Sequence, residues 1–369
     1  MKIAQIAPLI ESVPPRLYGG TERVVSYLTE ELVRQGHDVT LFASGDSKTS
    51  ARLVACCERA LRLDARVREH VPYHLAMLEK VKRLAARFDI LHFHTDLVHF
   101  PVFSSVRQAT VTTLHGRLDL FELQEFYRSF SDMPLVSISD AQRTTIPDAN
   151  FAATVLHGLP PDLLAATYRR NGDYLAFVGR IAPEKGVDRA IEIARQVGMP
   201  LKIAAKVDRA DETYFREVIA PLLCARSVQF IGEIDEQEKV RFIGDAQALL
   251  FPIDWPEPFG LVMIEAMACG TPVLAFDRGS VQEVIANGVS GIIVNGVTEA
   301  IAAVRAATCL DRKAVRRCFE QRFTAKRMAA QYVRLYEELT ARARAGTIMP
   351  FKRPTPQPTA HALIEAPAS

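Results

Sequence analysis

Two glutamates stand eight positions apart in a segment that reads as a turn followed by an apolar helix. Glu257 precedes Pro258-Phe259-Gly260, and Glu265 lies between Ile264 and Ala266. Carboxylates are among the side chains least often buried without a partner, so Glu265 needs a polar group to receive it. The N-terminal end of a helix also favours anions such as phosphate. We therefore expect a polar ligand at this end of the helix.

Two cations mark a second place where an anion could bind. Arg180 and Lys185 flank a loop that follows a strand expected at 174–179 and opens a helix. Two positive side chains and the positive end of a helix dipole converge there, which suits a diphosphate. A solvated loop with two surface cations is the alternative interpretation.

A glycine pair follows the first expected strand, at 3–8. Gly19 and Gly20 permit unusual backbone angles and the close approach of a ligand or of another domain. An ordinary turn explains the pair equally well, because an intact dinucleotide-binding fingerprint is absent.

Histidines stand at the ends of two further strands. His92 and His94 share one face of the strand expected at 89–93. A metal site there lacks a convincing third ligand, and no Asp-x-Asp or HExxH motif appears, so no metal is expected. His115 ends the strand expected at 109–114, where it could contact a substrate as a hydrogen-bond donor or as an acid or base. A structural histidine is the alternative.

Composition narrows the class of protein. A chain of 369 residues with 49% hydrophobic residues is long enough for two domains, and a net charge of +2 gives no reason to expect nucleic acid as a partner. Six cysteines without paired spacing suit a reducing compartment, and no signal peptide or spanning segment is recognised. We therefore expect a cytoplasmic protein. Peripheral membrane contact stays open because Lys80, Lys82 and Arg83 share a helix with Leu78 and Val81.

The elements that must position these residues alternate between short β-branched runs and amphipathic helices, which predicts parallel sheets covered by helices. Gly36 is expected to stop a first helix that begins near Thr21. A long last helix is expected after Thr324, with Met328, Tyr332, Leu335 and Leu339 on one face. The remaining strands are expected at 38–43, 134–138, 153–156, 201–205, 228–231, 248–252, 273–276 and 291–294.

These patterns together resemble the retaining glycosyltransferases of family 4, also called group 1, which have the GT-B fold. The motifs that carry the resemblance are Glu257 to Glu265 with Pro-Phe-Gly between them, Ala268-Cys269-Gly270-Thr271-Pro272-Val273, and Gly179-Arg180-Ile181 with Glu184-Lys185-Gly186. The resemblance implies two Rossmann-like, doubly wound α/β domains facing each other across a cleft. It implies an acceptor-side domain at 1–160 and a nucleotide-sugar domain at 161–322. A C-terminal helix at 323–342 would pack back toward the first domain, and a disordered tail would fill 343–369.

The resemblance also implies a reaction, the transfer of a sugar from a nucleotide-sugar donor to a hydroxyl acceptor with retention and without a metal or other cofactor. Another GT-B activity, such as an epimerase or a phosphorylase, and a non-catalytic sugar-nucleotide-binding subunit are the alternatives. His157-Gly158 departs from the Asn-Gly that many members have. The resemblance gives catalytic roles to Arg180, Lys185, Glu257 and His115. It gives contacts with the donor to Gly19, Gly20, Gly232, Ile234, Phe259, Gly260, Leu261 and Glu265. It also implies that Glu233 lies beside the base and that Ser139 lines the cleft.

Overall fold

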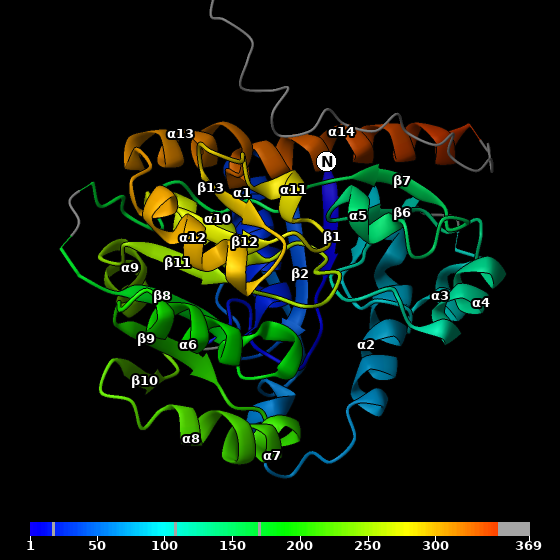
Figure 1. Ribbon diagram of the computed structural model, residues 1–369. Coiled ribbons are helices and arrows are strands. Elements are labelled where there is room, and N and C mark those ends of the chain that lie inside the picture. The colour runs from blue at the N-terminus through cyan, green and yellow to red at the C-terminus, as the bar shows by residue number, and fades with distance from the viewer. Residues whose placement is uncertain (17–18, 107–108, 169–170, 346–369) are drawn as a thin grey trace, which may run out of the picture. The chain divides into compact units, whose positions relative to one another are not determined.

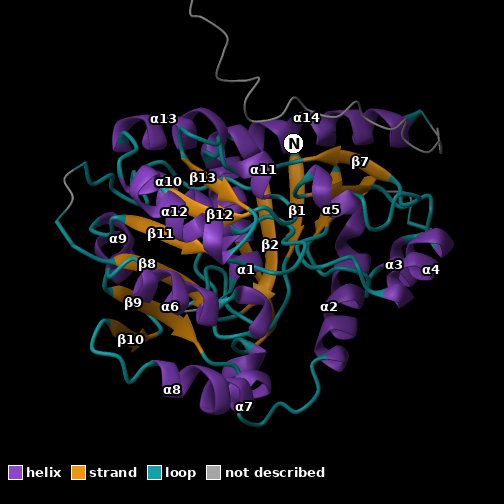
Figure 2. Ribbon diagram, in the orientation of Figure 1, coloured by secondary structure: helices purple, strands orange, loops and turns teal. Residues whose placement is uncertain are grey.

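The computed structural model describes residues 1–16, 19–106, 109–168 and 171–345 (Figure 1). They form two compact units. Unit 1 contains Met1–Gly158 together with the last helix, α14 (Ala325–Arg344), and unit 2 contains Leu159–Thr324. Each unit is built around one parallel sheet with helices packed on it, as the colouring by secondary structure shows (Figure 2).

The sheet of unit 1 changes winding direction between its first strand and its fourth. The strand order is β3-β2-β1-β4-β5-β6-β7, and every described pairing in it is parallel. In such sheets ligands bind outside the carboxyl ends of the strands at the point of reversal, which here lies between β1 and β4. The strands are β1 (Lys2–Ile6), β2 (Asp38–Ser44), β3 (Arg52–Cys57), β4 (Ile90–Phe93), β5 (Ala109–Thr113), β6 (Leu135–Ser137) and β7 (Phe151–Thr154).

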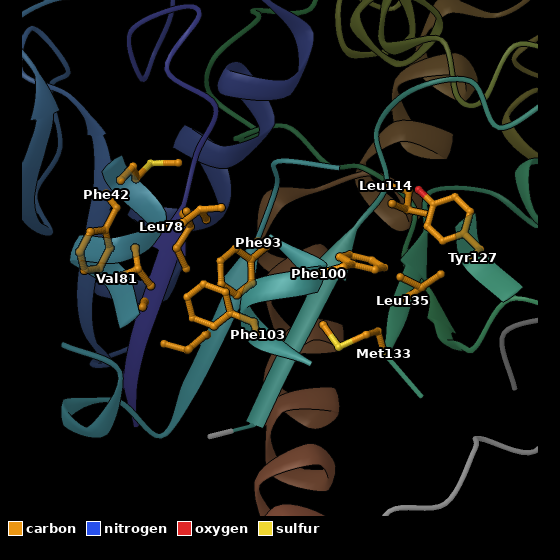
Figure 3. Close-up of a cluster of buried hydrophobic side chains, with 14 of the residues drawn as sticks. Phe42, Leu78, Val81, Phe93, Phe100, Phe103, Leu114, Tyr127, Met133 and Leu135 are labelled. Atoms are coloured by element: carbon orange, nitrogen blue, oxygen red, sulfur yellow. The ribbon is translucent and has the colours of Figure 1, made fainter. Parts of the chain in front are cut away.

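The two faces of this sheet carry different kinds of side chain. On one face Leu91 and Phe93 enter an apolar core, which Figure 3 shows with Phe103 beside Phe93. Burial of each such side chain contributes about 1.5–3 kcal/mol. Because side chains alternate along a strand, His92 lies on the opposite face, toward α14. The other helices of unit 1 are α1 (Gly20–Arg34), α2 (Val71–Leu84), α3 (Phe100–Phe103), α4 (Phe121–Ser129) and α5 (Asp140–Arg143).

Helix ends in unit 1 follow the sequence signals. After α1, Gly36 has a φ of +85°, the His37 N–H donates to the Leu32 carbonyl at 3.1 Å, and the Gly36 N–H donates to the Val33 carbonyl at 2.9 Å. These two bonds form a Schellman stop, as expected from the glycine. Helix α14 begins directly after Thr324 and buries all four residues of its predicted apolar face.

The apolar side of α2 is part of the unit 1 core. Leu78 and Val81 are buried there, and Leu84 and Phe88 pack against the same cluster. This face is therefore not available to a lipid surface, which removes the sequence argument for membrane contact through it.

Unit 2 repeats the arrangement with its point of reversal between β8 and β11. The strand order is β10-β9-β8-β11-β12-β13, again with every described pairing parallel. Helix α6 packs beside α12, and α10 packs against β11, β12 and α13. The strands are β8 (Leu175–Arg180), β9 (Leu201–Lys206), β10 (Val228–Gly232), β11 (Ala248–Phe251), β12 (Val273–Phe276) and β13 (Gly291–Val294). The helices are α6 (Val187–Gln196), α7 (Glu212–Tyr214), α8 (Ala220–Leu222), α9 (Glu236–Gly244), α10 (Leu261–Ala268), α11 (Val281–Val284), α12 (Val297–Thr308) and α13 (Arg312–Arg322), with a π-helical turn at Phe215–Ile219.

Two sequence expectations differ from the structure. Strand β3 was not expected, because Arg52–Cys57 is a half-buried edge strand without a clear alternation of apolar and polar residues. The last helix, expected to end at 342, continues to Arg344, so Ala343 and Arg344 belong to α14. Residues 346–369 lie outside the described part of the chain.

Candidate functional site

The loops after β8 and β11 are tied together at the point of reversal in unit 2. The Asp254 N–H donates to the Glu184 carbonyl at 2.8 Å, and Arg189 Nε donates to the Pro252 carbonyl at 2.9 Å. Gly186 has a φ of +73°, and a Cβ there would lie 2.1 Å from the Pro252 oxygen. Only glycine fits this position, so it sets how closely the two loops approach.

This approach brings Lys185 and Glu257 into contact. Lys185 Nζ lies 2.5 Å from Glu257 Oε2, and both side chains are largely buried, with 18% and 12% of their surfaces exposed. Trp255 Nε1 donates to the same carboxylate oxygen at 2.8 Å, and Lys185 Nζ lies 4.6 Å from the centre of the indole ring. A lysine from one loop and a carboxylate from the other thus share a largely buried polar site.

Gly279, which the sequence analysis did not single out, fits tightly against Glu257. Its φ is +56°, and a Cβ there would lie 2.4 Å from the Glu257 carbonyl oxygen and 2.5 Å from its nitrogen. The Ser280 N–H donates to the Glu257 carbonyl at 3.0 Å. The loop after β12 therefore holds the backbone of Glu257 from a third side. The signal in the sequence is the Arg278-Gly279-Ser280 turn directly after that strand.

Arg180, at the end of β8, is surrounded by carboxylates. Its guanidinium pairs with Glu184 at 2.5 Å and with Asp211, and its Nε lies 3.8 Å from Asp208. Arg180 and Lys185 were expected from the sequence to be the two cations of one diphosphate site. The structure gives the two cations separate anionic partners, of which Asp208 and Asp211 were not foreseen.

Glu265 also has a partner within the chain. It is 5% exposed in α10, and Lys239 Nζ of α9 donates to its Oε1 at 2.8 Å. Lys239 also contacts Glu236 Oε1 at 2.8 Å. Lys239 therefore provides a polar partner for Glu265 within the chain, so the burial of this carboxylate does not by itself call for a ligand. Lys239 lies 26 positions before Glu265 in the sequence, and no local pattern pairs them. A ribose contact by Glu265 stays a prediction based on the resemblance.

The remaining donor contacts expected in unit 2 lie at two strand ends. Gly260 has a φ of +77° and precedes α10, which begins at Leu261, while Phe259 is buried. In the first turn of α10 the Met263 N–H donates to the Gly260 carbonyl at 3.0 Å, so the N–H groups of Leu261 and Val262 are the ones that we expect to meet an anionic or hydroxyl group. Gly232 has a φ of +80° and ends β10 at the edge of the sheet, and Ile234 follows it half-buried.

His115 follows β5 in unit 1, and its imidazole is enclosed by other rings. Its Nε2 lies 2.8 Å from His94 Nδ1, and its ring stacks on that of His157 at 5.2 Å between centroids. Burial lowers the pKa of His115 to about 3. The imidazole is therefore neutral near pH 7 and has no spare proton to supply as an acid.

Gln142 positions the loop that carries His115, and the sequence analysis missed it. Its Nε2 donates to the carbonyls of Leu114 at 2.9 Å and Gly116 at 2.8 Å, the two neighbours of His115. Ser139, expected to line the cleft, caps α5 by accepting a hydrogen bond from the Gln142 N–H at 3.0 Å. The hydroxyl of Ser139 thus has a structural role in forming α5.

Gly19 and Gly20 lead into α1 from a tightly packed turn. A Cβ on Gly19 would lie 2.8 Å from the Pro15 side chain and 3.2 Å from Glu22 Oε2. Glu22 is buried, and burial raises its pKa to about 7. Local packing therefore already explains Gly19, and its contact with a donor stays a prediction.

His92 lies on β4 and His94 follows the end of this strand, with the two ring centroids 4.0 Å apart. Their nitrogens bond to neighbouring side chains of unit 1. Within the described residues, no three His, Cys, Asp or Glu side chains gather in a way that could hold a metal ion.

Family models match most of the chain. The model of glycosyl transferases group 1 matches residues 167–321, and the model of glycosyltransferase family 4 matches residues 18–167. The first match covers the loops that hold Arg180, Lys185, Glu257 and Glu265, and the second covers His115. The chain belongs to the group 1, family 4 glycosyltransferases.

Curated relatives of this glycosyltransferase carry the same class of activity in their names. The phosphatidyl-myo-inositol mannosyltransferase of Mycolicibacterium smegmatis is 26% identical over 92% of this chain and 94% of its own length. The glycogen synthase of Mycobacterium tuberculosis is 26% identical over 76% of this chain and 79% of its own. The chain is therefore an enzyme that transfers glycosyl groups.

Solved structures show that the glycosyltransferase has the GT-B fold. AviGT4, a glycosyltransferase involved in avilamycin A biosynthesis, has a TM-score of 0.73 at 23% identity, over 92% of this chain and 98% of its own. Anabaena HepE in complex with UDP and glucose has a TM-score of 0.71 at 18% identity, over 92% and 100%. None of the helices in the described part of the glycosyltransferase is long and apolar enough to cross a bilayer.

Proposed function

We propose that this glycosyltransferase moves a sugar from a nucleotide-sugar donor to a hydroxyl acceptor, with retention at the anomeric carbon and without a metal ion. The observation that carries the proposal is the contact of Lys185 and Glu257 at the point of reversal in unit 2, where ligands of such sheets bind. Structures of the similar HepE, which contain UDP and UDP-glucose, support a nucleotide-sugar donor.

The donor would be bound from several strand ends of unit 2. Arg180 and Lys185 would hold the diphosphate, exchanging their present carboxylate partners for phosphate oxygens. N–H groups of Phe259, Gly260 and Leu261 would contact the sugar or the phosphate. Further contacts would complete the donor site. Glu257 would contact the transferred sugar, and Glu265 would contact the ribose. Gly232, Glu233 and Ile234 would border the base, and Gly19 and Gly20 of unit 1 would contact the phosphates.

In the proposed step, the bond between the anomeric carbon and the diphosphate oxygen breaks while the acceptor oxygen bonds to the same carbon on the same face. The acceptor's proton passes to the leaving diphosphate oxygen, so no protein nucleophile is needed. Arg180, Lys185 and the N-terminus of α10 would stabilise the negative charge on the diphosphate. Fixed charges of this kind do the work that a divalent cation does in other transferases.

A thermal-shift panel with UDP-, GDP-, ADP- and dTDP-linked sugars tests the donor. A ligand that binds the folded state raises the apparent stability by about 2.7 kcal/mol at a hundredfold excess over its Kd. We expect a higher Tm with one of these nucleotides and no requirement for a divalent cation, so the shift persists in EDTA. An unchanged Tm with all four donors, or a shift that EDTA abolishes, contradicts the proposal.

A further inference from the structure

A continuous chain of buried hydrogen bonds links His115 to the last helix of the protein. It lies within unit 1, on the face of β1, β4 and β5 that α14 covers. His115 Nε2 lies 2.8 Å from His94 Nδ1, and His94 Nε2 lies 2.7 Å from Gln5 Oε1. The Gln5 amide nitrogen lies 3.1 Å from the hydroxyl of Tyr336.

The series of hydrogen bonds continues beyond Tyr336 to a second tyrosine of the same helix. The Tyr336 hydroxyl lies 2.6 Å from His92 Nδ1, and His92 Nε2 lies 2.7 Å from Thr113 Oγ1. Thr113 Oγ1 lies 2.8 Å from the Tyr332 hydroxyl. Apart from His115, which is half-buried as a whole residue, all members are fully buried, so water is not an alternative partner for them.

Gln5 fixes the direction of every hydrogen bond between it and His115. An amide has a distinct donor and acceptor end, and Gln5 gives its NH₂ to Tyr336 and its oxygen to His94. His94 must therefore carry its proton on Nε2, which leaves its Nδ1 as an acceptor. His115 must then carry its proton on Nε2 and donate it to His94.

The consequence appears at the far nitrogen of His115. Its Nδ1 is left without a proton, and among the described residues this buried atom has no hydrogen-bond partner. Burial keeps the pKa of the imidazole too low for a second proton near neutral pH. Nδ1 is therefore a fixed acceptor, and the chemical group that would satisfy it is a hydroxyl donor, which sugars supply in abundance.

We propose that Gln5 and Tyr336 are positioning residues that hold His115 in the Nε2–H tautomer, so that Nδ1 accepts a hydrogen bond from a sugar hydroxyl of the substrate. The tautomer does not depend on the function proposed above, whereas the hydroxyl partner rests on it. Tyr336 acts through Gln5. Without the tyrosine hydroxyl the Gln5 side-chain amide can rotate by 180°, which reverses the donor and acceptor roles in the hydrogen bonds to His94 and His115. Tyr332 stands beyond His92 and Thr113, so its hydroxyl does not determine how Gln5 is oriented.

The experiment compares Tyr336→Phe with the matched deletion Tyr332→Phe, since both remove one buried hydroxyl from the same helix. Nitrogen-15 NMR of histidine-labelled protein separates a protonated from an unprotonated ring nitrogen. We expect an unprotonated Nδ1 for His115 in the wild type and in Tyr332→Phe, and mixed tautomers in Tyr336→Phe. We expect kcat/KM to fall about tenfold in Tyr336→Phe, which corresponds to one misdirected hydrogen bond, and to stay within about twofold in Tyr332→Phe.

A protonated Nδ1 in the wild-type protein overturns the proposal, and this measurement needs neither a variant nor a substrate. An unchanged His115 spectrum in Tyr336→Phe also overturns it, and Gln5→Met provides the same test if the tyrosine variant does not fold. Failure of all nucleotide sugars to bind would refute the proposed function and leave the tautomer standing.

Two additions distinguish the source of the hydroxyl. A change in the Nδ1 signal with UDP-glucose, and none with UDP and free glucose, assigns the hydroxyl to the donor sugar. A change with UDP and free glucose assigns it to a separately bound sugar. An unchanged Nδ1 in both mixtures, at concentrations that raise the Tm, contradicts its role as an acceptor.

Discussion

At the scale of single residues, Lys185 and Glu257 define the site more sharply than the sequence alone could. Two loops from neighbouring strands each bring one charged side chain, and Trp255 packs against both. An ion pair that is largely shielded from water resists salt more than an exposed one. The same shielding would strengthen the hold of Lys185 on a phosphate oxygen.

Lys185→Met should lower kcat for release of nucleoside diphosphate by about 10²–10³, the usual cost of removing one preorganised charge from a developing anion. Lys202→Met is the matched control. This variant removes the same charge from the same unit. The Lys202 side chain lies over the ring of Tyr174, near the N-terminal end of β9. Equal rates in the two variants would show that Lys185 is not part of the site.

Gly279→Ala should disturb Glu257 through its backbone. Its Cβ would collide with the Glu257 main chain, whereas Gly198→Ala places a Cβ in open space at a similar positive φ. Both variants bear the strain of the left-handed region, roughly 1–2 kcal/mol by chemical denaturation. Beyond this shared loss of stability, we expect kcat/KM to fall more than about tenfold in Gly279→Ala and not in Gly198→Ala. Equal activity in the two alanine variants would mean that the position of Glu257 is unimportant.

At the scale of elements, helices α9 and α10 of unit 2 are joined by a buried ion pair. Lys239→Met leaves the Glu265 carboxylate buried without its cation, which should cost about 3–5 kcal/mol in urea unfolding. The double variant Lys239→Met, Glu265→Gln should recover part of that loss, because the uncompensated charge is gone. A double variant as unstable as the single one would contradict this reading of the pair.

The strands of unit 1 bury histidines, and acid should therefore unfold this unit first. Burial lowers the pKa of His92, His94, His99 and His157 well below the usual value, and that of His115 to about 3. Below about pH 6.5 these histidines bind protons in the unfolded chain but stay neutral in the folded unit, so stability is lost as the pH falls.

Two carboxyls oppose this effect in part. Burial raises the pKa of Glu22 to about 7 and that of Asp96 to about 6, so their contribution is present at low pH and is lost as the pH rises through those values. The buried histidines outnumber these two carboxyls, so the net effect is a loss of stability as the pH falls below about 6.5.

The single tryptophan supplies an internal comparison for this acid transition. Trp255 lies in unit 2, whereas the five histidines lie in unit 1. During acid titration we expect far-UV circular dichroism to change before the fluorescence of Trp255. A fluorescence change that comes first would contradict the assignment of acid sensitivity to unit 1.

At the scale of the whole molecule, the sequence predicts the fold well and the site in part. The alternation of strands and helices predicted two parallel α/β units, because each of these signals is local in the chain. The motifs around Arg180 and Glu257 carried the resemblance that implied the GT-B fold. The partners of the predicted residues were not predictable. Lys239 contacts Glu265 across 26 residues, and Gln142 holds the loop of His115 across 26 and 28 residues, through packing that leaves no local pattern.

The series of hydrogen bonds from His115 to Tyr332 could not be predicted either, and here the partners lie further apart in the sequence. Tyr332 was predicted from its helical spacing as an apolar residue facing the core, and it is buried. Its hydroxyl also meets Thr113, which lies 219 positions away. Periodicity gives the face of a helix, but it does not show which polar atoms of a sheet that face will meet.

The stereochemistry of donor turnover tests the proposed function most directly. Proton NMR follows the anomeric signal while the enzyme consumes an α-linked nucleotide sugar, with water taking the place of the acceptor. The proposal predicts that the α-anomer of the free sugar appears first, in EDTA, and that this activity is lost in Lys185→Met and kept in Lys202→Met. Initial release of the β-anomer, or no consumption of any of the four donors, would contradict it.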